Sequence, residues 1–237
     1  MNDFSGKSVM VLGGSRGIGA AIVRHFTAAG AKVSFSYSGS PDAAAAVAAE
    51  TGATAVKADS ANRDELIAAV AGAGALDIMV INAGVAKMGD PLTLDADVVD
   101  RLIDVNVRAP YHAGVEAGRR MNDNGRIIII GSVNGDRVPV AGLTAYALSK
   151  SAVQGIGRGL ARDFGARGIT VNVVQPGPVD TDMNPAEGPL AKMLHGMMAI
   201  PRHAHADEIA ALVLFLASPA AAMITGTTQT IDGGMGI

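Results

Sequence analysis

Short runs of Val, Ile, Leu and Met alternate along the chain with longer, alanine-rich amphipathic segments. Apolar runs this short and continuous are typical of strands that are buried on both faces of a sheet. They predict strands at Ser8–Leu12, Lys32–Tyr37, Ala53–Lys57, Ile78–Ile81, Arg126–Ile130, Thr170–Val174 and Thr228–Ile231. The segments between them predict helices at Ile18–Ala29, Pro41–Thr51, Asp64–Ala71, Ala96–Val107, Tyr111–Met121, Tyr146–Phe164 and Ala206–Ala217.

This alternation predicts an α/β protein with a doubly wound Rossmann fold, in which helices flank both faces of a parallel sheet of about seven strands. No linker, repeat or low-complexity stretch divides the sequence, so we expect residues 1–237 to form a single domain. The least regular part is Asp182–His205, which is rich in Met, Pro, Gly and His. An irregular segment of this length predicts a lid or binding loop for a substrate.

The overall composition excludes several classes of protein. Hydrophobic residues make up 49% of the chain and charged residues only 17%, which indicates a packed globular protein. A net charge of −3 gives no general attraction to nucleic acid or to an anionic membrane. The absence of cysteine excludes disulfides and thiolate catalysis. With no long apolar run and no secretory pattern, we expect a cytoplasmic protein without nucleic-acid or membrane partners.

A glycine-rich turn with the spacing G-x-x-x-G-x-G follows the first predicted strand and opens the first helix. Its sequence is Gly13-Gly14-Ser15-Arg16-Gly17-Ile18-Gly19. Glycines let the backbone turn sharply, and the free N–H groups of a helix N-terminus attract a pyrophosphate. The position of the turn favours nucleotide binding over a plain tight turn. The cofactor-binding candidates in it are Gly13, Ser15, Arg16, Gly17, Ile18 and Gly19.

The second predicted strand ends without the carboxylate that commonly holds a ribose 2′-hydroxyl group. A 2′-phosphate would therefore not be repelled, and Arg16 and the nearby serine hydroxyls can bond to it. This predicts NADP(H) as the cofactor in preference to NAD(H), with Tyr37 and Ser38 among its contacts. The alternative is that Arg16 is only a solvated surface charge.

A phenol and an ammonium group lie four residues apart, at Tyr146 and Lys150, and hence on one face of a predicted helix. A nearby cation favours the phenolate, which makes the tyrosine a usable acid/base near neutral pH. Ser132 follows the strand Arg126–Ile130 at its carboxyl end, where its hydroxyl can stabilise a substrate carbonyl. A tyrosine–lysine pair with this spacing is, on its own, more often an exposed pair.

Two further motifs contain asparagine. Asn106 falls inside the predicted helix Ala96–Val107, where an asparagine usually bonds to the backbone. Asn82-Ala83-Gly84 follows the strand Ile78–Ile81, which suits either close approach of a cofactor or a plain turn at the strand end.

With these motifs the chain resembles the short-chain dehydrogenase/reductase family from end to end. The resemblance also covers Pro176-Gly177 with Thr181, and the terminal Thr225-Gly226 and Asp232-Gly233-Gly234. The sequence departs from the family pattern at Leu12, where the family usually has a threonine that stabilises the turn.

The resemblance implies an NADP(H)-dependent oxidoreductase that transfers a hydride between nicotinamide and a carbonyl or alcohol substrate. Tyr146 would be the general acid/base, and Lys150 would lower its pKa and hold the nicotinamide ribose. Ser132 would polarise the carbonyl, and Asn106 would hold a water molecule in the proton relay. The implied cofactor contacts are Asp59 at the adenine, Asn82, Ala83 and Gly84 along the ribose, and Pro176, Gly177, Val179 and Thr181 at the nicotinamide.

A narrower resemblance, over Gly131–Pro185, is to bacterial family members that bind NADPH and also cyclic-di-GMP. It leaves open an alternative function, in which the protein binds both molecules and acts by sequestration or sensing in biofilm dispersal. Family members commonly pair long helices rich in small residues, so we expect a homotetramer or homodimer. The histidines lack metal-ligand spacing, and we expect no metal site.

Overall fold

The computed structural model describes residues 3–237, and its sheet has seven strands that all pair in parallel. The strands are β1 (Ser8–Leu12), β2 (Lys32–Tyr37), β3 (Thr54–Lys57), β4 (Leu76–Ile81), β5 (Met121–Ile130), β6 (Thr170–Pro176) and β7 (Thr228–Ile231). Their order across the sheet is β3-β2-β1-β4-β5-β6-β7. The order reverses between β1 and β4, which is where doubly wound folds bind their ligands. The predicted fold class is confirmed.

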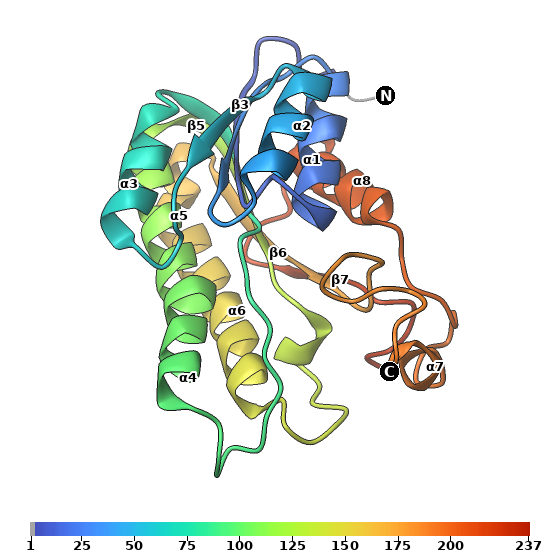
Figure 1. Ribbon diagram of the computed structural model, residues 1–237. Coiled ribbons are helices and arrows are strands. Elements are labelled where there is room, and N and C mark those ends of the chain that lie inside the picture. The colour runs from blue at the N-terminus through green and yellow to red at the C-terminus, as the bar shows by residue number, and fades with distance from the viewer. Residues whose placement is uncertain (1–2) are drawn as a thin grey trace.

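Helices cover both faces of this sheet (Figure 1). They are α1 (Gly17–Ala28), α2 (Pro41–Thr51), α3 (Arg63–Gly72), α4 (Ala96–Ile103), α5 (Ala109–Arg120), α6 (Thr144–Phe164), α7 (Ala191–His195) and α8 (Ala206–Ala217). One layer contains α1, α2 and α8, and the opposite layer contains α3 to α6. The short helix α7 lies apart from both layers, near the C-terminus.

The core consists of two apolar layers, one on each side of the sheet. Val9 and Val11 of β1 pack toward α1 and α8, whereas Met10 and Leu12 pack toward α3, α5 and α6. Successive side chains of a strand point to opposite faces, and helices cover both faces here. The central strands β1 and β4 and the second half of β5 are therefore mostly apolar, which explains their continuous apolar runs in the sequence.

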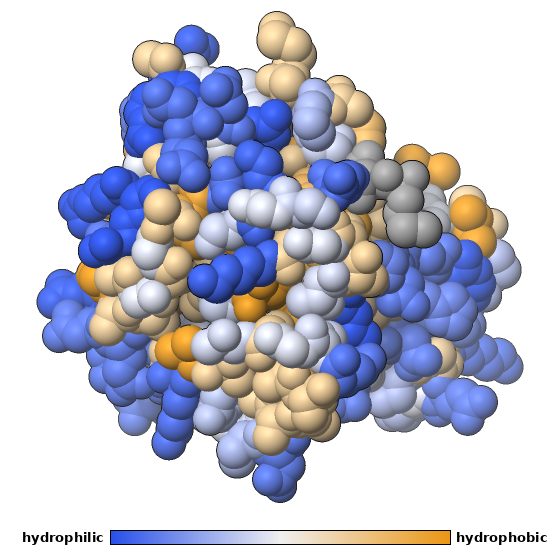
Figure 2. Space-filling model, turned by 90° about the horizontal axis from the view of Figure 1, so that it is seen from above, coloured by the Kyte–Doolittle hydropathy of each residue, from blue (hydrophilic) through white to orange (hydrophobic). Residues whose placement is uncertain are grey.

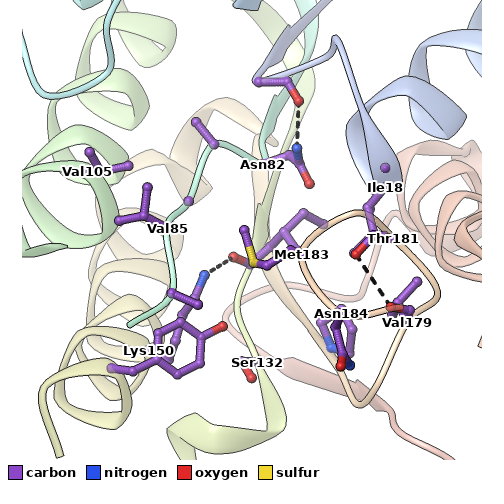
Figure 3. A pocket seen from close by; sticks show the side chains of 18 of the residues that line it. Ile18, Asn82, Val85, Val105, Ser132, Lys150, Val179, Thr181, Met183 and Asn184 are labelled. Carbon is purple, nitrogen blue, oxygen red and sulfur yellow. Dashed lines mark hydrogen bonds between the residues drawn. The ribbon is translucent and has the colours of Figure 1, made fainter. Parts of the chain in front are cut away.

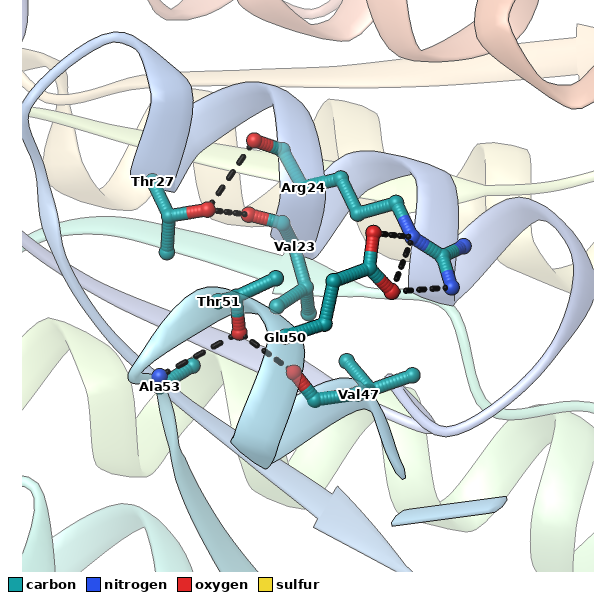
Figure 4. A network of polar contacts seen from close by, with 7 residues as sticks. All are labelled: Val23, Arg24, Thr27, Val47, Glu50, Thr51 and Ala53. Carbon is teal, nitrogen blue, oxygen red and sulfur yellow. Dashed lines mark hydrogen bonds and ion pairs between the residues drawn. The ribbon is translucent and has the colours of Figure 1, made fainter. Parts of the chain in front are cut away.

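Polar contacts fasten the alanine-rich helix α2 to α1 (Figure 4). Arg24 donates to both carboxylate oxygens of Glu50, with N···O distances of 2.8–2.9 Å. The Thr51 hydroxyl donates to the Val47 carbonyl at 2.6 Å and accepts from the Ala53 N–H at 3.2 Å. The ion pair is exposed and contributes on the order of 0–1 kcal/mol, so these contacts chiefly set where the chain turns into β3.

The molecular surface is mostly hydrophilic in the view from above, with strongly hydrophobic residues visible only in small, separate areas (Figure 2). On this side of the molecule, strongly apolar side chains therefore lie mostly below the surface. Within residues 3–237, no helix is long and apolar enough to cross a membrane.

The structure differs from the predicted elements most clearly at β5. This strand begins at Met121, which the sequence pattern assigns to the end of a helix, and α5 ends one residue earlier. Asn124 has a positive φ of 63°, and the pairing register with β4 shifts between Leu76 and Ile78. Asparagine adopts this left-handed conformation more readily than most residues, so the irregular first half of the strand has the sequence of a turn.

Two smaller differences concern helices near the predicted site. The single helix predicted over Ala96–Val107 is divided, because α4 ends at Ile103 and the π-helical turn η1 (Asp104–Arg108) follows. Residues 182–205 are irregular as predicted, but they contain the short helix α7.

Candidate active site

A cavity of about 780 Å³ opens at the carboxyl ends of the strands. A volume of this size is ordinary for a small-molecule site. Its walls include all but two of the residues predicted as cofactor contacts or catalytic groups. The two exceptions are Gly19 and Asn106, which lie behind the wall and support it.

The glycine-rich turn is fastened to two neighbouring strands. The Gly13 N–H, at a φ of 75°, donates to the Ser36 hydroxyl at 3.0 Å, and the Asn82 amide donates to the Gly13 carbonyl at 2.7 Å (Figure 3). The side chain of Leu12 is buried in the core instead of bonding to the turn. Ser36 and Asn82 thus stabilise the turn without the threonine usual at position 12. The sequence gives no signal for the role of Ser36.

Gly19 packs directly against this turn. A Cβ atom at position 19 would lie 2.0 Å from the Gly13 carbonyl oxygen and 2.6 Å from the Asn82 amide nitrogen. Contacts this short require the backbone to move. Glycine at position 19 therefore allows α1 to begin against the turn, and with it the N-terminal N–H groups that suit a pyrophosphate.

We expect Gly19→Ala to lower the free energy of unfolding by about 2 kcal/mol and to weaken NADPH binding about tenfold or more, because the turn must shift. Chemical denaturation and fluorescence titration measure the two effects. Gly72→Ala is the matched control, since a Cβ there meets nothing within 4 Å. It should be neutral or stabilising by up to about 1 kcal/mol. An equal loss in both variants would contradict the role of Gly19.

At one end of the cavity, the wall includes Arg16 together with Tyr37 and Ser38 at the end of β2. The Arg16 side chain is largely exposed and lies 3.5 Å from the Asp182 carboxylate. This ion pair links the turn to the irregular segment 182–205. Both groups are solvated, so the pair is weak and Arg16 remains available to an anion.

The Asp59 carboxylate also lines the cavity, but both of its oxygens are engaged. They accept from the Arg101 guanidinium group of α4 at 2.8 and 2.9 Å. This hydrogen-bonded cation holds the pKa of Asp59 below its usual value. The negative charge at this wall is therefore balanced and does not exclude a phosphate. Arg101 was missed from the sequence, because it lies 42 residues from its partner and carries no motif.

Ser132, Tyr146 and Lys150 meet where β5 ends beside α6. The Ser132 hydroxyl accepts from the Asn134 N–H at 3.2 Å, which caps the short helix η2 (Val133–Gly135). The Lys150 ammonium group donates to the Ile130 carbonyl at 3.2 Å and lies 5.8 Å from the centre of the Tyr146 ring (Figure 3). The three side chains that the sequence predicts as catalytic are thus brought together.

Burial has the largest effect on the pKa of both the tyrosine and the lysine. It lowers the pKa of the Lys150 ammonium group to about 8. It raises the pKa of the Tyr146 phenol, and interaction with the Ser132 hydroxyl only partly offsets this. The direction differs from the expected lowering by the cation, because burial has the larger effect. The phenol is therefore protonated near neutral pH and ready to donate.

Asn106 lies in η1 and is 1% exposed. Its amide nitrogen donates to the Val85 carbonyl at 2.8 Å and to the Ser149 hydroxyl at 3.1 Å, and its oxygen accepts from the Val85 N–H at 2.9 Å. These bonds join η1 to the loop after β4 and to α6. Asn106 bonds to backbone, as asparagine in a helix often does, but to the backbone of another segment. π-Helical turns are frequent at functional sites.

Residues 182–205 form the outer wall of the cavity, and we refer to them as the lid. His195 of α7 and the buried His203 are joined by an Nε2···Nδ1 hydrogen bond of 2.8 Å. Burial lowers the pKa of His203, whose Nε2 atom has no partner among the described residues. His205 instead caps the start of α8, together with Glu208. Although His203 and His205 are close in sequence, His203 bonds to α7 and His205 caps α8.

Comparison with protein families and curated sequences gives consistent results. A family model described as enoyl-(acyl carrier protein) reductase matches residues 13–236. The cyclic-di-GMP-binding biofilm dispersal mediator protein of Escherichia coli K12 is 62% identical over 236 residues, covering 100% of both chains. The acetoacetyl-CoA reductase of Shinella zoogloeoides is 36% identical over 233 residues, covering 95% of this chain and 96% of its own.

Solved structures match equally well. The crystal structure of BdcA in complex with NADPH has 63% sequence identity and a TM-score of 0.96, and the match covers 97% of this chain and 94% of that one. A short-chain dehydrogenase/reductase from Serratia marcescens has 50% identity and a TM-score of 0.97, with 99% of each chain covered. A short-chain dehydrogenase from Burkholderia cenocepacia in complex with NADP has 45% identity and a TM-score of 0.96, with 100% of each covered.

Proposed function

The chain belongs to the short-chain dehydrogenase/reductase family, and from that premise we propose that it is an NADP(H)-dependent oxidoreductase for a small carbonyl or alcohol substrate. The observation that supports this most strongly is the meeting of Ser132, Tyr146 and Lys150 in one cavity with the glycine-rich turn. When bound, the cofactor supplies or accepts the hydride. The residues of the chain supply the proton and orient the reactants.

In the direction of reduction, Tyr146 donates its phenolic proton to the substrate oxygen. The Ser132 hydroxyl donates a hydrogen bond to the same oxygen and stabilises the negative charge that develops there. Lys150 supports this step as a cation, fixed by the Ile130 carbonyl. We assign two roles to Asn106. Its hydrogen bonds fix the relative positions of η1, Val85 and α6. It also holds a water molecule that returns a proton to the active site.

For the cofactor, we propose that the pyrophosphate binds at the N-terminus of α1 and the nicotinamide beside residues 176–181. Structures of relatives in complex with NADPH or NADP support the choice of cofactor. The preference for NADP(H) is supported by Arg16 at the turn and by the absence of a carboxylate at the end of β2. Asp59, the acidic group nearby in the wall, is paired with Arg101.

We expect Ser38→Asp to lower kcat/KM for NADPH about tenfold or more relative to NADH, because a carboxylate at the end of β2 repels a 2′-phosphate. Ser38 is exposed and lines the cavity, so the change leaves the core intact. Ser38→Asn is the control, with the same shape and no charge. If both variants shift the cofactor ratio equally, charge at this position does not determine the preference.

The direct test of the oxidoreductase function is NADPH oxidation across ketones, diketones and quinones, with NADPH binding measured in parallel by its fluorescence. Turnover of at least one carbonyl class is the expected outcome. Tight binding of NADPH without turnover of any of them would contradict the proposed function.

A second function, binding of cyclic-di-GMP, is favoured by one observation: a relative that is 62% identical over the whole chain is named for it. On this alternative, the protein acts in biofilm dispersal by sequestering or sensing the dinucleotide. Calorimetric titration with cyclic-di-GMP, with and without NADPH, tests it. Binding that NADPH abolishes would place both ligands in the cavity, and no binding in either condition would exclude the alternative.

We also propose that the chain forms a homotetramer or homodimer through α5 and α6. Tyr111 and Leu148 are about half exposed, at 51% and 56%, and a Cβ added at Gly155 or Gly159 would meet nothing within 4 Å. An open, partly apolar helix face of this kind suits a symmetric contact. Light scattering should give two or four times the chain mass of 23.9 kDa for the wild type. Leu148→Asp should give a smaller mass, because it places a charge on the helix face that forms the contact. A single-chain mass for the wild type would contradict assembly.

A further inference from the structure

The charged residues of the cavity are unevenly distributed. At the cofactor end, Arg16 is paired with Asp182, and Arg101 is paired with Asp59. Beyond Ser132, the wall is built by the loop after β4, the segment between η2 and α6, the lid and the C-terminal segment. The apolar side chains that these segments contribute include Met88, Leu143, Met183, Leu190, Met193 and Met235.

The polar side chains of this second end are mostly uncharged. Asn134 and Asn184 are neutral amides. Three described lining residues of these segments carry charge: Asp182 of the lid, which pairs with Arg16 toward the cofactor end, and Lys87 and Lys150, of which Lys150 donates to the Ile130 carbonyl. Lys87 is exposed, so water and salt screen its attraction for an anion. Among the described residues, the cations of this end are therefore an exposed lysine and the proposed catalytic lysine, with none dedicated to a carboxylate or phosphate of the substrate.

The apolar side chains around this end are also unusually exposed. Met88 is 44% exposed, Met183 63% and Met193 39%. Exposed apolar groups that gather around a concave site indicate a ligand that covers them. Methionine is flexible and polarizable, and its sulfur makes favourable contacts with aromatic rings, so such a wall adapts to ring-containing molecules of different shapes.

We infer that the substrate is a neutral, largely apolar carbonyl compound, such as a ring-containing ketone, diketone or quinone. This inference rests on the proposed oxidoreductase function and specifies which carbonyls it acts on. A substrate that carries a carboxylate or phosphate would place that charge against methionine and leucine side chains, without a dedicated partner. Desolvation of an unpaired charge is strongly unfavourable, so the site should select against such substrates.

Matched pairs of substrates test the inference, because each pair compares a carboxylate with its neutral methyl ester at a position away from the ketone. Methyl 4-acetylbenzoate is compared with 4-acetylbenzoate, and methyl 5-oxohexanoate with 5-oxohexanoate, at saturating NADPH. The expected kcat/KM is about a hundredfold higher for each ester than for its acid. In 5-oxohexanoate three methylene groups separate the charge from the ketone, so intrinsic reactivity contributes little to the ratio of that pair. The aromatic ring transmits part of the substituent effect in the acetylbenzoate pair, so the aliphatic pair decides the outcome.

Variants of the lid make the test specific to this wall. Met193→Lys introduces a cation there and should reduce the ester-to-acid ratio about tenfold, chiefly by improving the acid. Leu92→Lys, at a residue that is 91% exposed and does not line the cavity, should leave the ratio unchanged.

The outcomes separate the two proposals. Acids reduced as well as their esters would overturn the substrate inference and leave the oxidoreductase function standing. If protein that binds NADPH reduces none of these esters and acids but turns over another compound of the carbonyl panel, the substrate inference is judged on that compound and is overturned if it is charged. If nothing in the panel is reduced either, the oxidoreductase function fails, and the substrate inference fails with it. An ester preference that Met193→Lys and Leu92→Lys change to the same extent would show that this wall does not set it.

Discussion

Replacing Tyr146 with phenylalanine is expected to lower kcat for carbonyl reduction about a thousandfold, while NADPH binding stays within about twofold of wild type. The substitution removes only the phenolic oxygen, and with it the proton donor. The partly buried position and the ring contact with Lys150 remain. Stopped-flow or steady-state oxidation of NADPH measures kcat, and fluorescence titration measures the affinity.

Tyr111→Phe is the matched control for this experiment. Tyr111 lies on α5, is 51% exposed and does not line the cavity. Its loss of the same oxygen should leave kcat unchanged. If Tyr146→Phe keeps more than about a tenth of the wild-type kcat, another group donates the proton, since a positioned general acid contributes about a hundredfold or more. The assignment of Tyr146 would then be wrong.

Replacing Lys150 with methionine is expected to remove most of the activity and yet to stabilise the fold. The lysine is 6% exposed, and burial lowers its pKa from 10.5 to about 8. At pH 7 the folded protein therefore holds a charge that burial disfavours, at a cost on the order of 3 kcal/mol. Methionine keeps the length of the side chain but leaves the Ile130 carbonyl without its donor, which costs about 1 kcal/mol. A net gain of about 1–2 kcal/mol in unfolding free energy follows.

The sign of the pH dependence provides an independent check on Lys150. Between pH 8 and 10.5 the unfolded chain holds the lysine proton and the folded chain releases it, so wild-type stability should rise across this window. In Lys150→Met this contribution is absent. Urea unfolding at several pH values measures it, with the exposed Lys32→Met as a control that should stay within about 0.5 kcal/mol of wild type. A destabilised Lys150→Met variant at pH 7 would show that the buried charge is well compensated.

Much of the fold and of the site could be predicted because the decisive signals are local. Continuous apolar runs mark the strands, and the glycine spacing marks the turn. The four-residue interval between Tyr146 and Lys150 places both on one helix face. The start of β5 could not be predicted, because an irregular first half that includes Asn124 at positive φ has the composition of a turn.

What the sequence did not indicate are contacts made between distant segments. Arg101 meets Asp59 only because the fold brings α4 to the end of β3, and Ser36 supports the turn only because β2 lies beside β1. The raised pKa of Tyr146 depends on burial and on where the Lys150 ammonium group is held. Spacing along a helix predicts that two side chains are neighbours, but not which atoms meet.

The catalytic groups and much of the apolar wall come from different segments of the chain, and this separation has an evolutionary consequence. Ser132, Tyr146 and Lys150 lie at the end of β5 and on α6, whereas the lid contributes much of the apolar wall and none of these three groups. Asp182 of the lid pairs with Arg16, but substitutions elsewhere in the lid can accumulate without changing the proton donor or the residues of the glycine-rich turn. A duplicated copy of this gene can therefore acquire activity toward a new substrate through few substitutions in the lid. Among relatives that share this scaffold, lid sequences should diverge first.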